Sequence, residues 1–122
     1  MKKIMVYEDD LGICGILSIL LQKEGYLVSI GREVNDAICE KIIDYAPDLI
    51  IMDLKLPKIG GEAAVKMIKN NPQTSKIPLL IFSSVYEAKA IAKTYNAEGF
   101  VPKPSDTSIL IDEINSLIGA TK

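Results

Sequence analysis

Five short and almost entirely apolar runs are spaced along the 122 residues of this chain. They lack the strict polar alternation of a half-exposed strand, so they are typical of strands buried on both faces of a parallel sheet. We expect the five strands at residues 4–7, 26–30, 49–52, 79–82 and 99–101. Because 48% of the residues are hydrophobic, a chain of this length can bury a sizeable core.

A stretch with helical spacing of apolar residues follows each run, and Gly or Pro residues separate the elements. We expect these helices at about residues 11–22, 38–43, 61–69, 86–95 and 105–118. Asn96 falls where the fourth helix should end, and Asn often replaces Gly in a left-handed cap. Five strand–helix units with short connections predict an α/β fold in which helices cover both faces of a parallel sheet. No linker or repeat interrupts the pattern, so we expect one domain over residues 1–122.

Polar residues follow four of the five apolar runs. Glu8 and Asp9 follow the first run, Asp53 the third, Ser83 the fourth and Lys103 the fifth. In an open parallel sheet the carboxyl ends of the strands line one crevice, and ligands bind there. We therefore expect three carboxylates, a hydroxyl and an ammonium to meet in one place. This combination suits a divalent cation and a phosphoryl group.

Charge and cysteine content exclude several classes of protein. The net charge is −2, and no basic cluster marks a surface for nucleic acid or an anionic membrane. The two cysteines, Cys14 and Cys39, have no metal-ligand spacing, so we expect reduced thiols. Acidic residues end the apolar start of the chain well short of a signal peptide or membrane segment. We expect a cytoplasmic protein that binds neither membrane nor nucleic acid.

Four segments together resemble the receiver domain of two-component response regulators. They are residues 4–10 (IMVYEDD), 50–61 (IIMDLKLPKIGG), 77–84 (IPLLIFSS) and 99–104 (GFVPKP). The resemblance extends from residue 3 to about 118. It implies a flavodoxin-like (βα)5 fold with the strand order 2-1-3-4-5. It also implies a regulatory phosphoacceptor, which catalyses only its own phosphorylation and dephosphorylation. The implied phosphate donor is a histidine kinase or a histidine phosphotransfer protein. The implied output is a protein target or an output domain outside this chain.

The resemblance assigns the site residues. Asp53 matches the phosphoacceptor, and a carboxylate can form an acyl phosphate by nucleophilic attack. Asp9, Asp53 and the backbone carbonyl of Lys55 match the Mg²⁺ ligands, while Glu8 matches a ligand that acts through water. Mg²⁺ prefers such oxygen ligands and keeps several waters. Lys103 matches the residue that contacts the phosphoryl group, and in the family a cis peptide bond joins this lysine to the next proline.

Ser83 and Phe100 match the residues that transmit the phosphorylation signal. Ser83 corresponds to a hydroxyl that binds the phosphoryl group and draws in the loop after residue 83. Phe100 corresponds to an aromatic switch residue on the fifth strand. Each residue also has an ordinary structural interpretation, as a loop serine and a core phenylalanine, and the sequence leaves that choice open.

Other functions are compatible with parts of the pattern. A phosphatase of the haloacid dehalogenase type also uses Asp after a parallel strand, but its second acid would stand where this chain has Lys55. A flavodoxin would need a hydroxyl- and Gly-rich phosphate loop after the first strand, where this chain has acids. A receiver-like binding module that is never phosphorylated stays open as an alternative.

Two further features bear on regulation. Lys55 and Val85 stand two residues after the acceptor and two after the switch serine. We expect Val85 to shield the phosphoryl group from water. Lys55 could either shield it as well or stabilise developing charge and speed hydrolysis, and we expect shielding to win and to prolong the lifetime of the phosphoryl group. The helix at 11–22 carries no charge, and we expect its outward side to include Leu11, Cys14, Gly15 and Ser18. Such an uncharged face suggests a docking surface for the helical bundle of the phosphate donor.

Overall fold

The computed structural model describes residues 1–119 and contains one parallel five-stranded sheet in the order β2-β1-β3-β4-β5. Every neighbouring pair of strands is parallel, which confirms the predicted topology. The strands are β1 (Lys3–Tyr7), β2 (Leu27–Gly31), β3 (Leu49–Met52), β4 (Leu79–Ser83) and β5 (Gly99–Pro102). The last three residues of the expected domain, 120–122, lie outside the described part of the chain.

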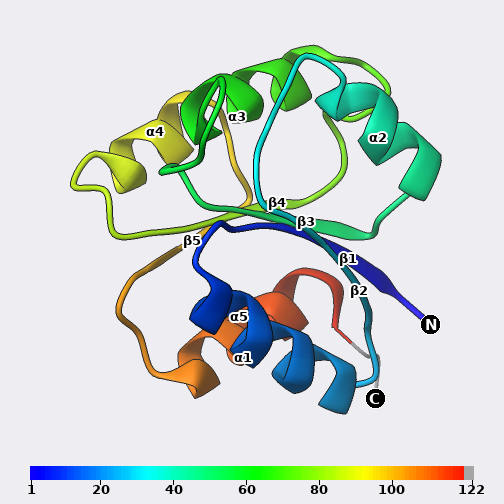
Figure 1. Cartoon of the computed structure of the whole chain (residues 1–122), viewed down its shortest axis with the longest axis vertical. Helices are drawn as coiled ribbons and strands as arrows, with labels where there is room; N and C mark the ends of the chain where they lie inside the picture. The colour runs from blue at the N-terminus through cyan, green and yellow to red at the C-terminus, as the bar shows by residue number, and fades with distance from the viewer. Residues whose placement is uncertain (120–122) are drawn as a thin grey trace.

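Within residues 1–119, five helices cover the two faces of the sheet (Figure 1). α2, α3 and α4 lie above the sheet in this view, and α1 and α5 lie below it. Their bounds are α1 (Leu11–Lys23), α2 (Ile38–Tyr45), α3 (Gly61–Asn70), α4 (Ala88–Thr94) and α5 (Thr107–Ile118). Among the described residues, no helix is long and apolar enough to cross a membrane.

Two helices start later than the sequence predicts. α4 begins at Ala88 rather than 86, and α5 begins at Thr107 rather than 105. Asp106 explains the second difference, because its carboxylate accepts a hydrogen bond from the Ser108 N–H and makes it the N-cap. The predicted left-handed conformation of Asn96 after α4 is confirmed by its φ of 59°.

The central strands separate two apolar clusters. Ile50 and Met52 of β3 pack with α2, α3 and α4, whereas Leu49 and Ile51 pack with α1 and α5. All four side chains are buried, as expected for a strand covered on both faces. These clusters hold the sheet rigid and fix the positions of the strand ends.

Gly61 allows α3 to start directly against the strand end that carries Asp53. A Cβ atom at Gly61 would lie 2.1 Å from the Asp53 carbonyl oxygen and 2.4 Å from the Leu54 Cα. No side chain fits there without displacing backbone, so glycine is required at this position. The Gly61 N–H donates to the Leu54 carbonyl at 3.1 Å, which fixes the chain on both sides of the close contact.

Candidate functional site

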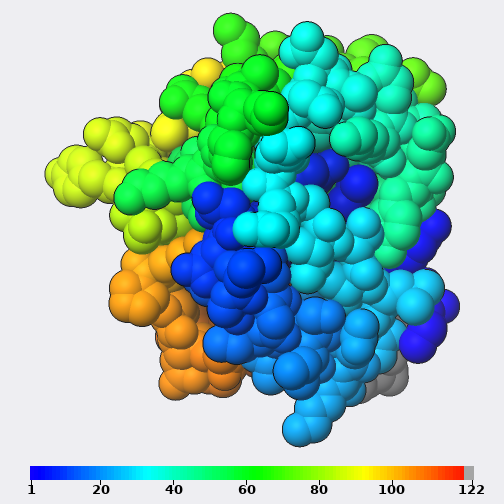
Figure 2. Space-filling view, viewed as in Figure 1, coloured from blue at the N-terminus to red at the C-terminus, as the bar shows by residue number. Residues whose placement is uncertain are grey.

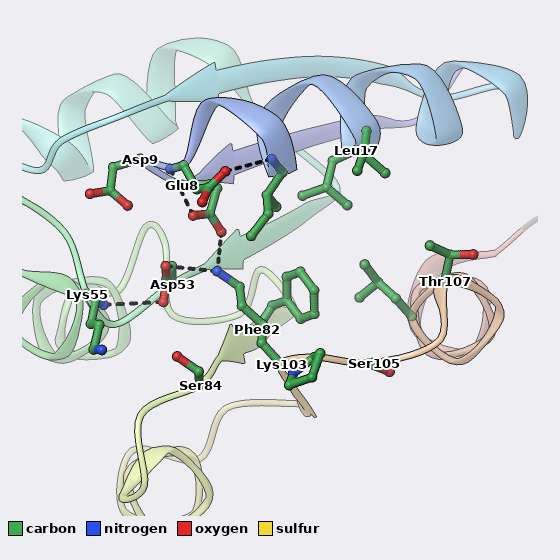
Figure 3. A pocket seen from close by; sticks show the side chains of 15 residues that line it. Glu8, Asp9, Leu17, Asp53, Lys55, Phe82, Ser84, Lys103, Ser105 and Thr107 are labelled. Atoms are coloured by element: carbon green, nitrogen blue, oxygen red, sulfur yellow. Dashed lines mark hydrogen bonds and ion pairs between the residues drawn. The ribbon is translucent and has the colours of Figure 1, made fainter.

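The carboxyl edge of the sheet brings together the acids predicted from the sequence. Glu8 and Asp9 follow β1, and Asp53 follows β3, the neighbouring strand. One carboxylate oxygen from each of the three residues lies within 4.8 Å of the others. Figure 3 shows these side chains facing one shared space. Three oxygen donors at this separation fit a hard divalent cation such as Mg²⁺.

Lys103 reaches this space from the end of β5. Its ammonium donates to Glu8 at 2.6 Å and to Asp53 at 3.0 Å (Figure 3). Glu8 and Asp53 are only 2% and 5% exposed, so both ion pairs are shielded from water. The peptide bond between Lys103 and Pro104 is cis, as the resemblance implies.

Burial and ion pairing raise the pKa values of two groups in the site, Glu8 and Lys103. Burial raises the pKa of Glu8, the hydrogen bonds from Lys103 and the Asp10 N–H counteract it, and the Asp53 charge adds to the rise. Burial alone would lower the pKa of Lys103, but its hydrogen bonds to Glu8 and Asp53 outweigh that effect and raise it. The site therefore favours the charged form of Lys103 and disfavours the charged form of Glu8.

Asp10 serves the helix rather than the site. Its side chain accepts a hydrogen bond from the Ile13 N–H at 3.0 Å and caps α1. Its own N–H donates to the Glu8 carboxylate at 3.1 Å. Of the three consecutive acids, Glu8 and Asp9 thus face the site, and Asp10 starts the helix that follows.

The segment after β4 differs from the expectation. Ser83 is buried, and its hydroxyl accepts a hydrogen bond from the Val85 N–H at 3.2 Å. Val85 packs against the apolar cluster on the α2–α3–α4 side, and Ser84 lines the cavity beside Asp53. Val85 is half-buried and is not among the residues that line the cavity, so the structure gives no support to its expected place beside the path of water to the acceptor. The reason is that the turn after β4 aims successive side chains in different directions, which sequence spacing does not reveal.

Lys55 follows β3 two residues after Asp53, and Phe100 lies on β5, as the sequence predicts. The Lys55 N–H donates to the Asp53 carboxylate at 3.3 Å, and its exposed side chain lines the cavity. Phe100 on β5 is half-buried against the α2–α3–α4 cluster. This partial burial is compatible with both interpretations of Phe100.

A cavity of about 570 Å³ extends from the carboxylates towards α1 and α5. Its far part is apolar and is lined by Ile13, Ile16, Leu17, Phe82 and Leu110. In the space-filling view, the blue start of α1 lies between the green segment after β3 and the orange segment after β5 (Figure 2). A charged site thus continues into an apolar groove at the molecular surface.

α1 exposes more apolar surface than the sequence predicts, and only in part through the expected residues, of which Leu11 and Gly15 are exposed. Leu11 is exposed as expected, and so are Ile16 and Ile19, which are 53% and 68% exposed. Cys14 is buried at 7% exposure, which corrects its expected place on the outward side. Ser18 is half-buried. The sequence prediction failed because an all-apolar helix gives little contrast for finding its inward face.

The fold and the acidic site define the class of protein. A doubly wound sheet with carboxylates and a lysine at its carboxyl edge is the architecture of receiver domains in two-component signalling. The family model for the response regulator receiver domain matches residues 4–115, and the chain belongs to this family. The family is regulatory.

Known proteins of this kind are similar over nearly the whole chain. The response regulator ArlR of Staphylococcus saprophyticus is 30% identical over 97% of this chain and 53% of that protein. The CAI-1 autoinducer sensor kinase/phosphatase CqsS of Vibrio cholerae is 27% identical over 93% of this chain and 17% of that protein. The structure of the V. cholerae chemotaxis protein CheY4 covers 96% of this chain, with a TM-score of 0.84 and 26% identity. The chain thus spans about half or less of the length of the two curated relatives.

Proposed function

We propose that Asp53 is the phosphoacceptor of this receiver domain and takes its phosphoryl group from a phosphohistidine of a histidine kinase or phosphotransfer protein. One observation carries the proposal. The Asp53 carboxylate is nearly buried, yet it faces two further carboxylates and an ammonium at the mouth of a cavity. Nothing in the packing of the core calls for this arrangement, whereas phosphoryl transfer requires it.

The transfer follows from these contacts. An Asp53 oxygen attacks phosphorus, the new P–O bond forms, the P–N bond to the donor histidine breaks, and the imidazole nitrogen keeps the bonding electron pair. Asp9, Asp53 and the Lys55 carbonyl would hold Mg²⁺, and Glu8 would act on it through water. Mg²⁺, when bound, offsets the negative charge of the approaching groups. Lys103 has three N–H donors, so it can bind a phosphoryl oxygen while it retains a carboxylate partner.

Phosphorylation then switches the segment after β4. The phosphoryl group adds about −1.5 to −2 of charge and new acceptors. Ser83 meets them by turning its hydroxyl from the Val85 N–H towards the phosphoryl oxygen. This turn moves the β4–α4 loop and the half-buried Phe100, and so changes the α4–β5–α5 surface that controls a target or an output domain. Ser83→Ala should accept phosphate but transmit the change poorly, measured as smaller NMR shifts in α4 and β5 with beryllofluoride.

The uncharged, exposed face of α1 is the docking surface for the phosphate donor. Leu11, Ile16 and Ile19 are exposed there, and the apolar groove beside them leads to Asp53. A helical bundle that buries these side chains would place its phosphohistidine at the mouth of the site.

The whole chain forms one receiver unit, and its output lies in a separate protein or in a further part of a longer chain.

Incubation with acetyl phosphate and Mg²⁺, followed by intact mass measurement, tests the proposal. We expect one added phosphoryl group on the wild type and none on Asp53→Asn. Asp48→Asn is the matched control, because Asp48 is a half-buried aspartate that accepts a hydrogen bond from the Lys3 N–H at 2.8 Å away from the site. Equal phosphate incorporation in Asp53→Asn and Asp48→Asn would refute the assignment.

A further inference from the structure

Two side chains from outside the site hold the turn that carries Glu8 and Asp9. The thiol of Cys14 donates to the Glu8 carbonyl oxygen, with the sulfur 3.2 Å away. The guanidinium of Arg32 donates to the Asp9 carbonyl oxygen at 3.4 Å. Arg32 is exposed and its contact is long, whereas the Cys14 contact is buried. The thiol is therefore the firmer of the two supports.

The Cys14 contact acts on a peptide plane that belongs to the cation site. The Glu8 carbonyl and the Asp9 N–H are parts of one planar peptide unit. Fixing the direction of that carbonyl therefore restricts the direction in which the Asp9 side chain leaves the backbone. Asp9 must point towards Asp53 for their oxygens to lie within 4.8 Å. A contact that fixes this carbonyl therefore bears on the separation of the two proposed cation ligands, Asp9 and Asp53.

The other polar groups of Glu8 have strong partners. Its N–H donates to the Gly31 carbonyl at 2.9 Å, and its carboxylate accepts from Lys103 and from the Asp10 N–H. These contacts fix the Glu8 side chain and the amide on its N-terminal side. The bond from the Asp10 N–H also spans the Glu8–Asp9 peptide, and the Cys14 thiol adds to this restraint by binding the Glu8 carbonyl itself.

We propose that Cys14 is a positioning residue for the divalent-cation site, acting through the Glu8–Asp9 peptide plane. The inference rests on the proposed function of that site and adds a residue to it. Cys14 touches neither cation nor phosphoryl group. Its role is to keep Asp9 aimed at Asp53, so its loss lowers cation affinity without removing a ligand.

Cys39 provides a matched control. It is the second cysteine, it is half-buried, and its thiol also donates to a backbone carbonyl, that of Met67, at 3.6 Å. That carbonyl belongs to α3 and has no link to the carboxylates. A general effect of removing a thiol–carbonyl contact would appear in Cys39→Ala as well, whereas a positioning effect is confined to Cys14.

Titration with Mg²⁺ tests the proposal, with the amide NMR signals of residues 8–10 as the readout. A lost neutral hydrogen bond corresponds to an affinity about three- to tenfold weaker, expected for Cys14→Ala and for Cys14→Val. Valine fills the thiol's space without a donor, so it keeps the test valid if the alanine variant folds poorly. Cys14→Ser should recover part of the affinity because it restores a donor, and Cys39→Ala should match the wild type.

The outcomes separate the two proposals. A wild type that does not bind Mg²⁺ overturns the cation site itself. A wild type that binds Mg²⁺, together with Cys14→Ala and Cys14→Val variants of equal affinity, overturns the positioning role alone. A change in thermal stability without a change in Mg²⁺ affinity also contradicts it, since that result is what a purely space-filling cysteine would give.

Discussion

Two lysines in this domain make similar contacts with opposite consequences. Lys69 of α3 donates to both carboxylate oxygens of Glu98, at 2.7 and 2.9 Å, and to the Ser75 carbonyl at 3.1 Å. The Glu98 carboxylate also accepts from the Leu79 N–H at 2.8 Å. One ammonium thus binds one carboxylate, and each group has one further hydrogen bond to the backbone. This pair ties α3 to the starts of β4 and β5.

Lys103 lies at the carboxyl ends of the strands, opposite the end where Lys69 and Glu98 lie, and its side chain is about as buried as that of Lys69. Its side chain is 12% exposed, against 8% for Lys69. Here a single ammonium meets the carboxylates of Glu8 and Asp53, and the Asp9 carboxylate lies close to both. Three carboxylates lie around the one ammonium that binds Glu8 and Asp53, so negative charge is in excess among these four groups, with the exposed Lys55 side chain also lining the cavity.

The difference teaches that charge balance, more than burial or ion pairing, separates a structural contact from a reactive site. A balanced pair such as Lys69–Glu98 needs nothing further and holds elements together. An unbalanced group attracts a cation, and its lysine can exchange a carboxylate partner for a phosphoryl oxygen.

The largest difference should appear in the rate of phosphorylation. Lys103→Met should slow phosphorylation by acetyl phosphate about a hundredfold, because one preorganised donor to the phosphoryl group is lost. Lys69→Met should leave the rate unchanged. Rates followed by intact mass would decide the point, and a similar slowing in both variants would contradict a special role for Lys103.

Stability should respond to carboxylate removal in opposite directions. Glu98→Gln leaves the Lys69 charge without its partner and should lower the free energy of unfolding by about 2 kcal/mol, less than for a fully buried pair because Glu98 is partly exposed. Asp53→Asn relieves repulsion and should keep or raise that energy, by up to about 1 kcal/mol. Urea denaturation without Mg²⁺ measures both values. A marked loss of stability in Asp53→Asn would show that the site is balanced after all.

Mg²⁺ should raise the free energy of unfolding through the site of Glu8, Asp9 and Asp53, and not through the Lys69–Glu98 pair. At ten times its dissociation constant, a ligand that binds only the folded state adds about 1.4 kcal/mol to the free energy of unfolding. Wild type and Glu98→Gln should gain this amount equally, whereas Asp9→Asn should gain little at the same concentration. If Mg²⁺ raised the free energy of unfolding of Asp9→Asn as much as that of the wild type, Asp9 would not be a ligand of the cation.

The smallest effect concerns the lifetime of the phosphoryl group. Lys55 lines the cavity, and its removal in Lys55→Ala should speed hydrolysis about threefold, well below the roughly hundredfold reach of in-line positioning. Val85 faces the core, so Val85→Thr should leave the lifetime unchanged. Loss of phosphate after removal of the donor provides the measurement, and the reverse ranking would restore Val85 as the shielding residue.

Much of this site follows from the order of residues along the chain. Parallel topology places the residues after β1, β3 and β5 at one edge, so Glu8, Asp9, Asp53 and Lys103 were expected to share it, although β4 lies between β3 and β5. The balanced pair at the other edge was not predicted. Lys69 and Glu98 lie 29 residues apart, and neither follows a strand end where the topology would indicate a shared site.

The family resemblance implied the strand order 2-1-3-4-5, whereas the residues alone determined the five strand–helix units, their parallel arrangement and the set of groups that meet at the carboxyl edge. These follow from apolar periodicity and from the rule that parallel strands end together. Only the tertiary structure decided where single side chains point: Cys14 inwards onto the Glu8 carbonyl, Val85 into the core and Ser84 into the cavity. Such directions depend on helix rotation and loop dihedrals, which packing against the rest of the fold selects.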